Sequence, residues 1–332
     1  MNILAIETSC DETACAVVGD GVKEICSVVA SSKEFHEKTG GVVPEVAARK
    51  QVEFIVPVIK EALARLPKGK KIDAVAVTVG PGLTGSLVVG VEAAKSLALA
   101  WGVPLIPVNH LVGHIYANFV GARKNIVFPA VALLVSGGHT DLVLMHDHGK
   151  FEYIGGTLDD AAGEAFDKTA RLLGLAKYLG GVTLSKKAAE CSKNLAAGKL
   201  PRPMIGKGYD FSFSGLKTAV RRLIEEQRFP IDSVACEFES AVVDVLVDKT
   251  MRATKEFAVK SVLLGGGVAA NTKLRNRLKL EAKKLGVSFH VPPVSLCTDN
   301  AVCIASAAFF NKQIKPIEKV NADPSLGIMD KL

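Results

Sequence analysis

Residues 3–18 read ILAIETSCDETACAVV, and this stretch decides the fold class. The apolar run Ile3–Ile6 predicts a buried strand, Ala14–Val18 predicts a second one, and the polar residues between them predict a turn. The same order of strand, polar turn and strand recurs at residues 131–145, where the turn reads SGGHT. A pattern that occurs twice along one chain predicts two similar α/β halves, each beginning with a hairpin.

Both predicted turns are rich in small polar residues. Glycine, serine and threonine expose backbone N–H groups and hydroxyls, which bind phosphate oxygens. Either turn alone is better explained as an ordinary hairpin turn, but two in corresponding positions favour a nucleotide site. A third element favours it too, because the strand Ser261–Leu264 runs into Gly265–Gly267, and Asn271 then opens a basic helix that continues to Lys284. Glycines between a strand and a helix N-terminus are typical of anion-binding corners.

Further helices and strands are expected between these elements. Residues 45–66 have helical periodicity, although Pro57 should divide or kink this helix. Residues 74–79 predict a buried strand, which a glycine-rich turn and a helix of small residues follow. In the second half, residues 160–173 predict an amphipathic helix, and an alternating stretch at 209–218 turns into another helix.

Two histidines on the connection between the halves are candidate metal ligands. His110 and His114 are four residues apart, so on a helix their side chains lie on the same face. Two imidazoles on one helical turn are a common part of a transition-metal site. The alternative is a pair of ordinary histidines near a helix start, one capping the helix and one half-buried. Leu111 stands where a zinc protease needs glutamate, which excludes that class.

The composition favours an intracellular protein of about two domains. The chain has 332 residues, 48% of them hydrophobic, and a net charge of +7, which is compatible with nucleic-acid binding but not diagnostic of it. Seven cysteines without a C-x-x-C pair argue against a disulfide scaffold or a zinc ribbon. No signal peptide is apparent, and no apolar run is long enough to span a membrane. We therefore expect a cytoplasmic protein that does not bind membranes.

Ten short motifs together resemble the TsaD family, the bacterial-type tRNA N6-threonylcarbamoyladenosine transferases formerly described as glycoproteases. They occur in order from residue 7 to residue 301 and are ETSCDET (7–13), GGVVPE (40–45), GPGLTGSL (80–87), NHLVGH (109–114), LVSGGHT (134–140), AGEAFDK (162–168), RPM (202–204), DFSFSGLKT (210–218), GGGVAAN (265–271) and CTDNA (297–301).

The resemblance implies a duplicated α/β fold of the actin/Hsp70/sugar-kinase type, with two similar lobes around a nucleotide cleft. We expect lobes at residues 1–107 and 108–307, with a C-terminal helix at 308–332 as a candidate addition to the first. The implied activity is transfer of a threonylcarbamoyl group from threonylcarbamoyl-AMP to N6 of adenosine 37 in tRNAs that read ANN codons. The implied partners are tRNA and two protein subunits, one TsaB-like and one TsaE-like. An ATP-dependent small-molecule kinase or ATPase of the same fold is the alternative, although it has no use for two metal-binding histidines.

The resemblance also implies site residues. The family's metal ligands correspond to His110, His114 and Asp299, and this set suits Fe²⁺ or, alternatively, Zn²⁺. From its position alone, Asp299 could instead cap the following helix. The residues expected to line the donor are Leu134, Val135, Ser136, Gly137, Gly138, Asp167, Gly180, Gly181 and Asn271.

Two further expectations concern chemistry and tRNA. Asp11 and Glu12, in the first turn, are candidates for positioning adenosine N6 or accepting its proton, although each could equally satisfy backbone groups of its own turn. The basic helix 272–284 could bind the phosphate backbone of tRNA, or be a solvated or partner-docking face.

The sequence departs from the family at YLGGV (178–182), which leaves open which glycine contacts the donor, and at Gln51, where the family commonly has histidine.

Overall fold

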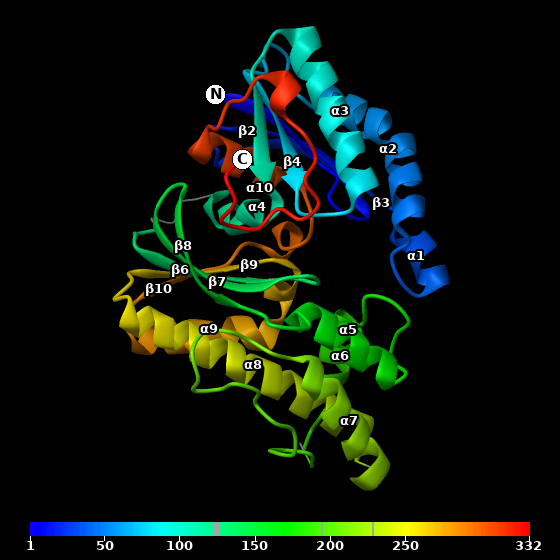
Figure 1. Cartoon of the computed structure of the whole chain (residues 1–332), viewed down its shortest axis with the longest axis vertical. Coiled ribbons are helices and arrows are strands. Elements are labelled where there is room, and N and C mark those ends of the chain that lie inside the picture. The colour runs from blue at the N-terminus through cyan, green and yellow to red at the C-terminus, as the bar shows by residue number, and fades with distance from the viewer. Residues whose placement is uncertain (122–125, 194, 228) are drawn as a thin grey trace. The chain divides into compact units, whose positions relative to one another are not determined.

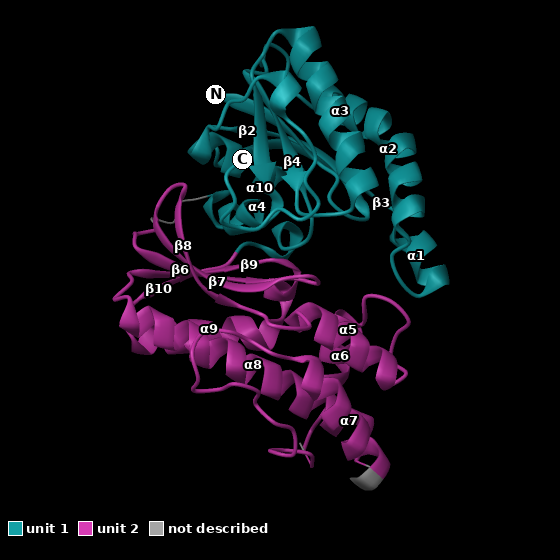
Figure 2. Cartoon of the chain, viewed as in Figure 1, with its two compact units in different colours: residues 1–125, 292–332 teal, residues 126–291 magenta. Residues whose placement is uncertain are grey.

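A computed structural model describes residues 1–121, 126–193, 195–227 and 229–332. The chain divides into two compact units, which Figure 2 shows in different colours. Unit 1 comprises residues 1–125 with 292–332, and unit 2 comprises residues 126–291. Each is an α/β unit built around its own sheet.

The elements of unit 1 are β1 (Asn2–Glu7), β2 (Glu12–Gly19), β3 (Lys23–Ser31), α1 (Lys33–Thr39), α2 (Pro44–Ala64), β4 (Ala74–Gly80), α3 (Thr84–Trp101), β5 (Leu105–Asn109), α4 (His110–Tyr116), the short 3₁₀ turns η1 (Ala117–Phe119) and η3 (Val294–Leu296), α10 (Ala301–Asn311) and η4 (Ile317–Lys319). Those of unit 2 are β6 (Ala130–Val135), β7 (Thr140–Asp147), β8 (Lys150–Gly156), α5 (Ala162–Leu172), α6 (Gly180–Ala189), α7 (Ser214–Gln227), α8 (Ile231–Glu256), β9 (Ser261–Gly265), η2 (Gly267–Ala270), α9 (Thr272–Lys284) and β10 (Ser288–His290).

The two sheets have the same topology. Sheet order is β3-β2-β1-β4-β5 in unit 1 and β8-β7-β6-β9-β10 in unit 2. Counted along the chain, the first strand of each unit pairs antiparallel with the second, and the second with the third. The first strand also pairs in parallel with the fourth, and the fourth in parallel with the fifth. The repeat in the sequence is therefore a repeat of structure, and the predicted duplicated α/β fold is confirmed.

Side chains along the strands of unit 1 alternate between the two faces of the sheet, and both faces are buried. Leu4 and Ile6 of β1 join Val77 of β4 in a core that α2 and α3 cover (Figure 1). Their neighbours Ala5 and Ala76 are equally buried and point to the opposite face, since successive side chains alternate. Helix α10 packs on β1 and β2. The alanines let this helix lie close to the strands.

Two expectations about helices differ from the structure. Helix α2 is continuous through Pro57, so of the two alternatives expected there, division or a kink, the structure excludes division. Proline removes the hydrogen bond to the carbonyl of Glu53, but both residues lie on the exposed side of the helix, where water can satisfy that carbonyl. The segment expected as a helix over 308–332 is helical in α10 only as far as Asn311, because Lys312 adopts a left-handed conformation and Pro316 follows.

The division into units also differs from the lobes expected at 1–107 and 108–307. Residues 108–121 and 292–307 belong to unit 1, because α4 packs against α10 and both lie on the first sheet. Consequently all three expected metal ligands belong to one unit. In the described part of the chain, no helix has the length and apolar character required to cross a membrane.

Candidate metal centre and substrate residues

The carboxyl ends of three parallel strands bring polar side chains together in unit 1. Strand β1 ends at Glu7, β4 passes through Thr78, and β5 ends at Asn109, directly before His110. The register pairs Ile6 with Val77 and Thr78 with Val108, so these ends lie at one edge of the sheet. Polar residues at this edge of an α/β sheet commonly form the functional site.

Asn109 fixes where helix α4 begins. Its side-chain oxygen accepts hydrogen bonds from the backbone N–H groups of Leu111, at 2.8 Å, and Val112, at 3.4 Å, which makes it the N-cap. Its side-chain nitrogen donates to the carbonyl of Gly327. Because the cap sets the helix start, His110 is the first helical residue and His114 lies one turn further along the same face.

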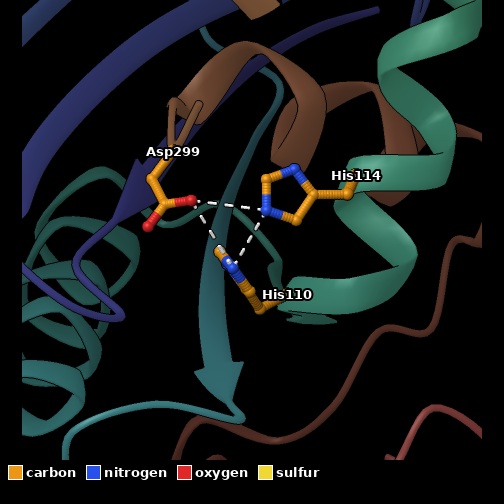
Figure 3. Close-up of side chains that lie close together, drawn as sticks. All are labelled: His110, His114 and Asp299. Atoms are coloured by element: carbon orange, nitrogen blue, oxygen red, sulfur yellow. Dashed lines mark hydrogen bonds and ion pairs between the residues drawn. The ribbon is translucent and has the colours of Figure 1, made fainter. Parts of the chain in front are cut away.

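The two histidines meet Asp299, as Figure 3 shows. The Nε2 atoms of His110 and His114 are 3.1 Å apart, and Asp299 Oδ1 lies 3.3 Å from the second and 3.7 Å from the first. His114 is buried, and the side chains of His110 and Asp299 are 13% and 21% exposed. A helix in the middle of the chain and a turn near its end thus supply one cluster, which the structure identifies as a candidate metal site.

Asp299 is free of the capping role considered from sequence. The N-cap of α10 is Asn300, whose side-chain oxygen accepts from the N–H of Cys303 at 3.0 Å. The side-chain nitrogen of Asn300 donates to the carbonyl of Thr298. The neighbouring asparagine therefore holds the turn in shape, and the Asp299 carboxylate is directed to the histidines.

The spacing of the three donor atoms fits a divalent cation. Nitrogen and oxygen ligands about 2.0–2.2 Å from a tetrahedral ion lie roughly 3.3–3.6 Å from one another. The observed separations of 3.1, 3.3 and 3.7 Å bracket that range. Two Nε2 lone pairs facing each other at 3.1 Å also require a cation or a proton between them. The residues present therefore fit a metal ion.

Charges around the histidines are strongly coupled. Burial alone would lower the pKa of His110, but the carboxylates of Glu7 and Asp299 outweigh burial and raise this pKa to about 9. Burial opposes ionisation of Asp299 as well, yet the two imidazoles and the Lys33 ammonium hold its pKa well below the ordinary value. A cluster with this much negative charge attracts a proton or a metal ion.

Asp11 and Glu12 lie beside the same cluster. Their carboxylates and that of Asp299 form a second group close enough to share a cation. Glu12 forms an ion pair with Lys33. Burial, a hydrogen bond that protonated Glu12 donates to Asp11, and the charge of Asp299 nevertheless raise the pKa of Glu12 to about 9, with the Lys33 ammonium opposing the shift. The first turn therefore brings both candidate acid–base residues to the metal ligands.

Gln51 of α2 holds that first turn in place. It is 1% exposed, and its side-chain nitrogen donates to the backbone carbonyls of Cys10, Glu12 and Thr8 at 2.8, 3.2 and 3.3 Å. Only the amide nitrogen can face three carbonyl oxygens, so the orientation of the side chain is fixed. The departure from the family at this position thus has a structural role.

In unit 2, the predicted turn at residues 136–138 follows strand β6, in which Leu134 and Val135 are completely buried. Ser136 closes the turn, since its backbone N–H donates to the carbonyl of His139 and its hydroxyl accepts from the N–H of that residue. Gly137 and Gly138 are exposed at the tip, and a Cβ on either would meet no neighbouring atom. Their backbone is therefore accessible to a ligand.

Asp167 of α5 contacts both glycines of the YLGGV departure. Its Oδ1 accepts from the N–H of Gly181 at 2.9 Å, and the N–H of Gly180 also hydrogen-bonds this carboxylate. A Cβ on Gly180 would lie 2.3 Å from the Cβ of Ala170, whereas one on Gly181 would meet only ordinary contacts. Packing therefore requires glycine at position 180 and not at 181.

Asn271 contacts helix α6, which begins at Gly180. Its oxygen caps α9 by accepting from the N–H of Leu274 at 2.8 Å. Its nitrogen donates to Glu239 Oε1 at 2.7 Å and to the hydroxyl of Ser185, in α6, at 3.0 Å. Three of the sequence segments expected to line the donor are therefore joined around α6 by hydrogen bonds.

Most basic side chains of α9 are held by contacts within unit 2. Arg277 lies 3.3 Å from Asp244, Lys273 hydrogen-bonds Ser240, and Arg275 donates to the carbonyl of Ala269. Among the remaining basic residues of this helix, Lys279 and Lys283 are exposed, as is Lys284, which pairs with Glu281. Charge reversal at the arginines would disturb these contacts, so the exposed lysines are better probes of tRNA binding.

Sequence reasoning gave no role to two residues of the site. Glu7 is 1% exposed and contacts His110. A charged residue directly after a fully apolar strand is a sign of a buried functional carboxylate, and it could have identified Glu7. The role of Gln51 had no comparable sign, because the carbonyls that it binds belong to a turn far away in the sequence.

Solved structures with a similar backbone define the class of protein. HypF of T. kodakarensis aligns with a TM-score of 0.64 at 17% identity, over 93% of this chain and 47% of its own. The activator of the 2-hydroxyisocaproyl-CoA dehydratase from Clostridium difficile aligns with a TM-score of 0.52 at 15% identity, over 93% and 94%. At these identities the likeness concerns the fold alone. The chain has a duplicated α/β fold of the actin/Hsp70/sugar-kinase type.

Sequence comparison is more specific. The family model for TsaD, tRNA N6-adenosine threonylcarbamoyltransferase, matches residues 23–306. The enzyme of that name from Bacillus subtilis strain 168 is 50% identical over 336 residues, which cover 98% of this chain and 95% of the relative. The one from Dehalococcoides mccartyi strain CBDB1 is 52% identical over 312 residues, 93% of each chain. The chain belongs to the TsaD family.

Proposed function

We propose that this chain is a transferase that forms N6-threonylcarbamoyladenosine at position 37 of tRNAs reading ANN codons, with threonylcarbamoyl-AMP as the donor. The match to the TsaD model over residues 23–306 is the observation that carries the proposal. The bond between the carbamoyl carbon and the phosphate oxygen breaks, a bond from that carbon to N6 forms, AMP leaves, and N6 loses a proton.

We propose that His110, His114 and Asp299 hold one divalent ion, Fe²⁺ or alternatively Zn²⁺. The separations of their donor atoms support this role, and a set of two histidines and one carboxylate suits either metal. When bound, such an ion supplies Lewis-acid stabilisation of negative charge on carbonyl or phosphate oxygens. Elemental analysis of protein purified without oxygen distinguishes the two metals.

The donor is assigned to the unit 2 residues identified by resemblance. The turn Ser136–Gly138 would bind donor oxygens through its accessible backbone, and Asp167 with Gly180, Gly181 and Asn271 would complete the site around α6. The exposure of Gly137 and Gly138 supports the first role. In this arrangement, backbone N–H groups would stabilise charge that develops on the donor during transfer.

Asp11 is the stronger candidate for accepting the proton of N6. Adenosine N6 is a weak nucleophile because its lone pair is delocalised into the ring, so a positioned base assists the attack. The raised pKa of Glu12 and its ion pair with Lys33 favour a positioning role for that carboxylate instead. Cys10, the cysteine of the first turn, does not support a covalent intermediate, since burial first of all raises the pKa of its thiol far above its ordinary value.

A reconstituted reaction tests the function. The protein is incubated with TsaB-like and TsaE-like subunits, threonylcarbamoyl-AMP and unmodified tRNA, and the digested tRNA is examined for the modified nucleoside by mass spectrometry. We expect modification that depends on the donor and on this chain. If the nucleoside is absent, and this chain alone forms ADP and a phosphorylated product when given ATP and a small-molecule acceptor, the alternative of a kinase is established.

A further inference from the structure

The carboxylate of Glu7 contacts His110 on the side of the ring away from the other two ligands. Its Oε2 lies 3.1 Å from Nδ1 of His110, while Nε2 of the same ring faces His114 and Asp299. Glu7 is itself held from two directions. The hydroxyl of Thr78 donates to the same Oε2, and the backbone N–H of Ser9 donates to Oε1 at 2.6 Å.

This arrangement selects one tautomer of His110. A carboxylate is an acceptor only, so Nδ1 of His110 must carry the hydrogen in their contact. In the neutral ring Nε2 then carries none and presents its lone pair to a cation. An imidazole that donates to a carboxylate through its second nitrogen is also a more basic ligand and is held in one orientation.

The second histidine lacks this support. Nδ1 of His114 is buried and has no hydrogen-bond partner among the described residues. The two imidazoles therefore differ, although their spacing on α4 makes them look equivalent in the sequence. The orientation of one is set by a charged partner at the end of β1, and that of the other is set by packing.

We propose that Glu7 is a positioning residue of the metal centre, which fixes His110 in the Nδ1–H tautomer and directs its Nε2 to the cation. The inference rests on the proposed metal site and adds a fourth side chain to it. It assigns Glu7 no contact with the donor or with tRNA.

Glu7→Gln is the informative substitution because it keeps the shape of the side chain. Both carboxylate oxygens accept hydrogen bonds, one from Ser9 and the other from Thr78 and His110. An amide replaces one of these oxygens with a donor, so whichever way it turns, two donors face each other. We expect the affinity for metal to fall about 10–100-fold, the usual effect of losing such a partner.

Affinity is measured on the full-length protein for Zn²⁺ and Co²⁺ by competition with a chelator, and the visible absorption of the Co²⁺ form reports ligand geometry. Glu237→Gln is the matched control, since Glu237 is also 1% exposed but lies in unit 2, paired with Arg202. Thr78→Val removes one of the hydrogen bonds that hold Glu7, and we expect a weaker loss of about three- to tenfold. Glu237→Gln should leave affinity and spectrum unchanged.

The outcomes separate this inference from the proposed metal site. If the wild-type protein binds neither ion, the metal site and the role of Glu7 are both rejected. If the wild type binds and Glu7→Gln matches it within about twofold in affinity, with the same Co²⁺ spectrum, the role of Glu7 alone is rejected. Should Glu7→Gln fail to fold, Thr78→Val decides, and unchanged affinity in that variant also rejects the proposal.

Discussion

Replacing Gln51 with methionine should loosen the turn that carries Asp11 and Glu12. Methionine has nearly the same length as glutamine but no donor, so the carbonyls of residues 8, 10 and 12 lose this donor in a buried position, and that of Cys10 keeps only the Ser86 hydroxyl, at 3.3 Å, among the donors identified. The amide has two hydrogens, which amounts to about two hydrogen bonds with a net contribution of about 1 kcal/mol each. Adding part of the cost of buried, unsatisfied carbonyls, we expect a loss of about 2–3 kcal/mol in the stability of unit 1.

The single tryptophan makes this loss measurable in unit 1 alone. Trp101 is the last residue of α3, so its fluorescence during urea denaturation reports on this unit even where unit 2 unfolds separately. The neighbouring substitution Val52→Ala is the control, because Val52 is 62% exposed and its loss should change stability by less than about 0.5 kcal/mol. Gln51→His, with one N–H in place of two, should lie between wild type and Gln51→Met. A Gln51→Met protein within about 0.5 kcal/mol of wild type would refute the bracing role.

The remaining predictions concern the site. The double variant His110→Ala/His114→Ala should purify without metal, and wild-type stoichiometry on elemental analysis would contradict the ligand assignment. The pKa of His110 is raised to about 9 in the metal-free protein, and only the neutral ring binds metal. The affinity for metal should therefore rise about tenfold per pH unit from pH 7 to 9 and then level off. An affinity that does not change with pH would contradict the role of His110 as a ligand. With the donor saturating, Asp11→Asn should lower the single-turnover rate about a hundredfold with metal retained, and more than Glu12→Gln does; equal, near-normal rates would exclude general base catalysis by either. Lys279→Glu should reduce the salt dependence of tRNA binding by about one unit of slope, and an unchanged slope would exclude this face.

The sequence predicted the fold well because the decisive information is local. Each central strand is a short apolar run bounded by polar or glycine-rich turns, and the order of runs in residues 3–18 repeats in residues 131–145. Edge strand β3 was not identified, since its burial is irregular and its hydrophobic pattern is correspondingly weak. Whether Pro57 interrupts α2 also depended on which side of the helix faces water, and that is a tertiary property.

Prediction of the site was limited by distance along the chain. The pair His110 and His114 could be recognised from its helical spacing, but only the family resemblance connected it to Asp299. Gln51 and Glu7 could not be placed by spacing, because each acts on atoms brought close by sheet formation and by the packing of α2. Residues that support a site from distant segments generally escape sequence reasoning, whereas pairs on a single helical turn do not.

The two hairpin turns of the duplicated fold differ in charge. The turn between β1 and β2 includes or adjoins Glu7, Asp11 and Glu12, and Asp299 lies beside it. The corresponding turn between β6 and β7 has no acidic residue in SGGHT and exposes glycine backbone. Carboxylates repel phosphate, so the first turn suits a cation and proton transfer, while the second suits the oxygens of an anionic donor. The same backbone hairpin is therefore suited to different ligands in its two copies, because Asp11 and Glu12 have no acidic counterpart within SGGHT.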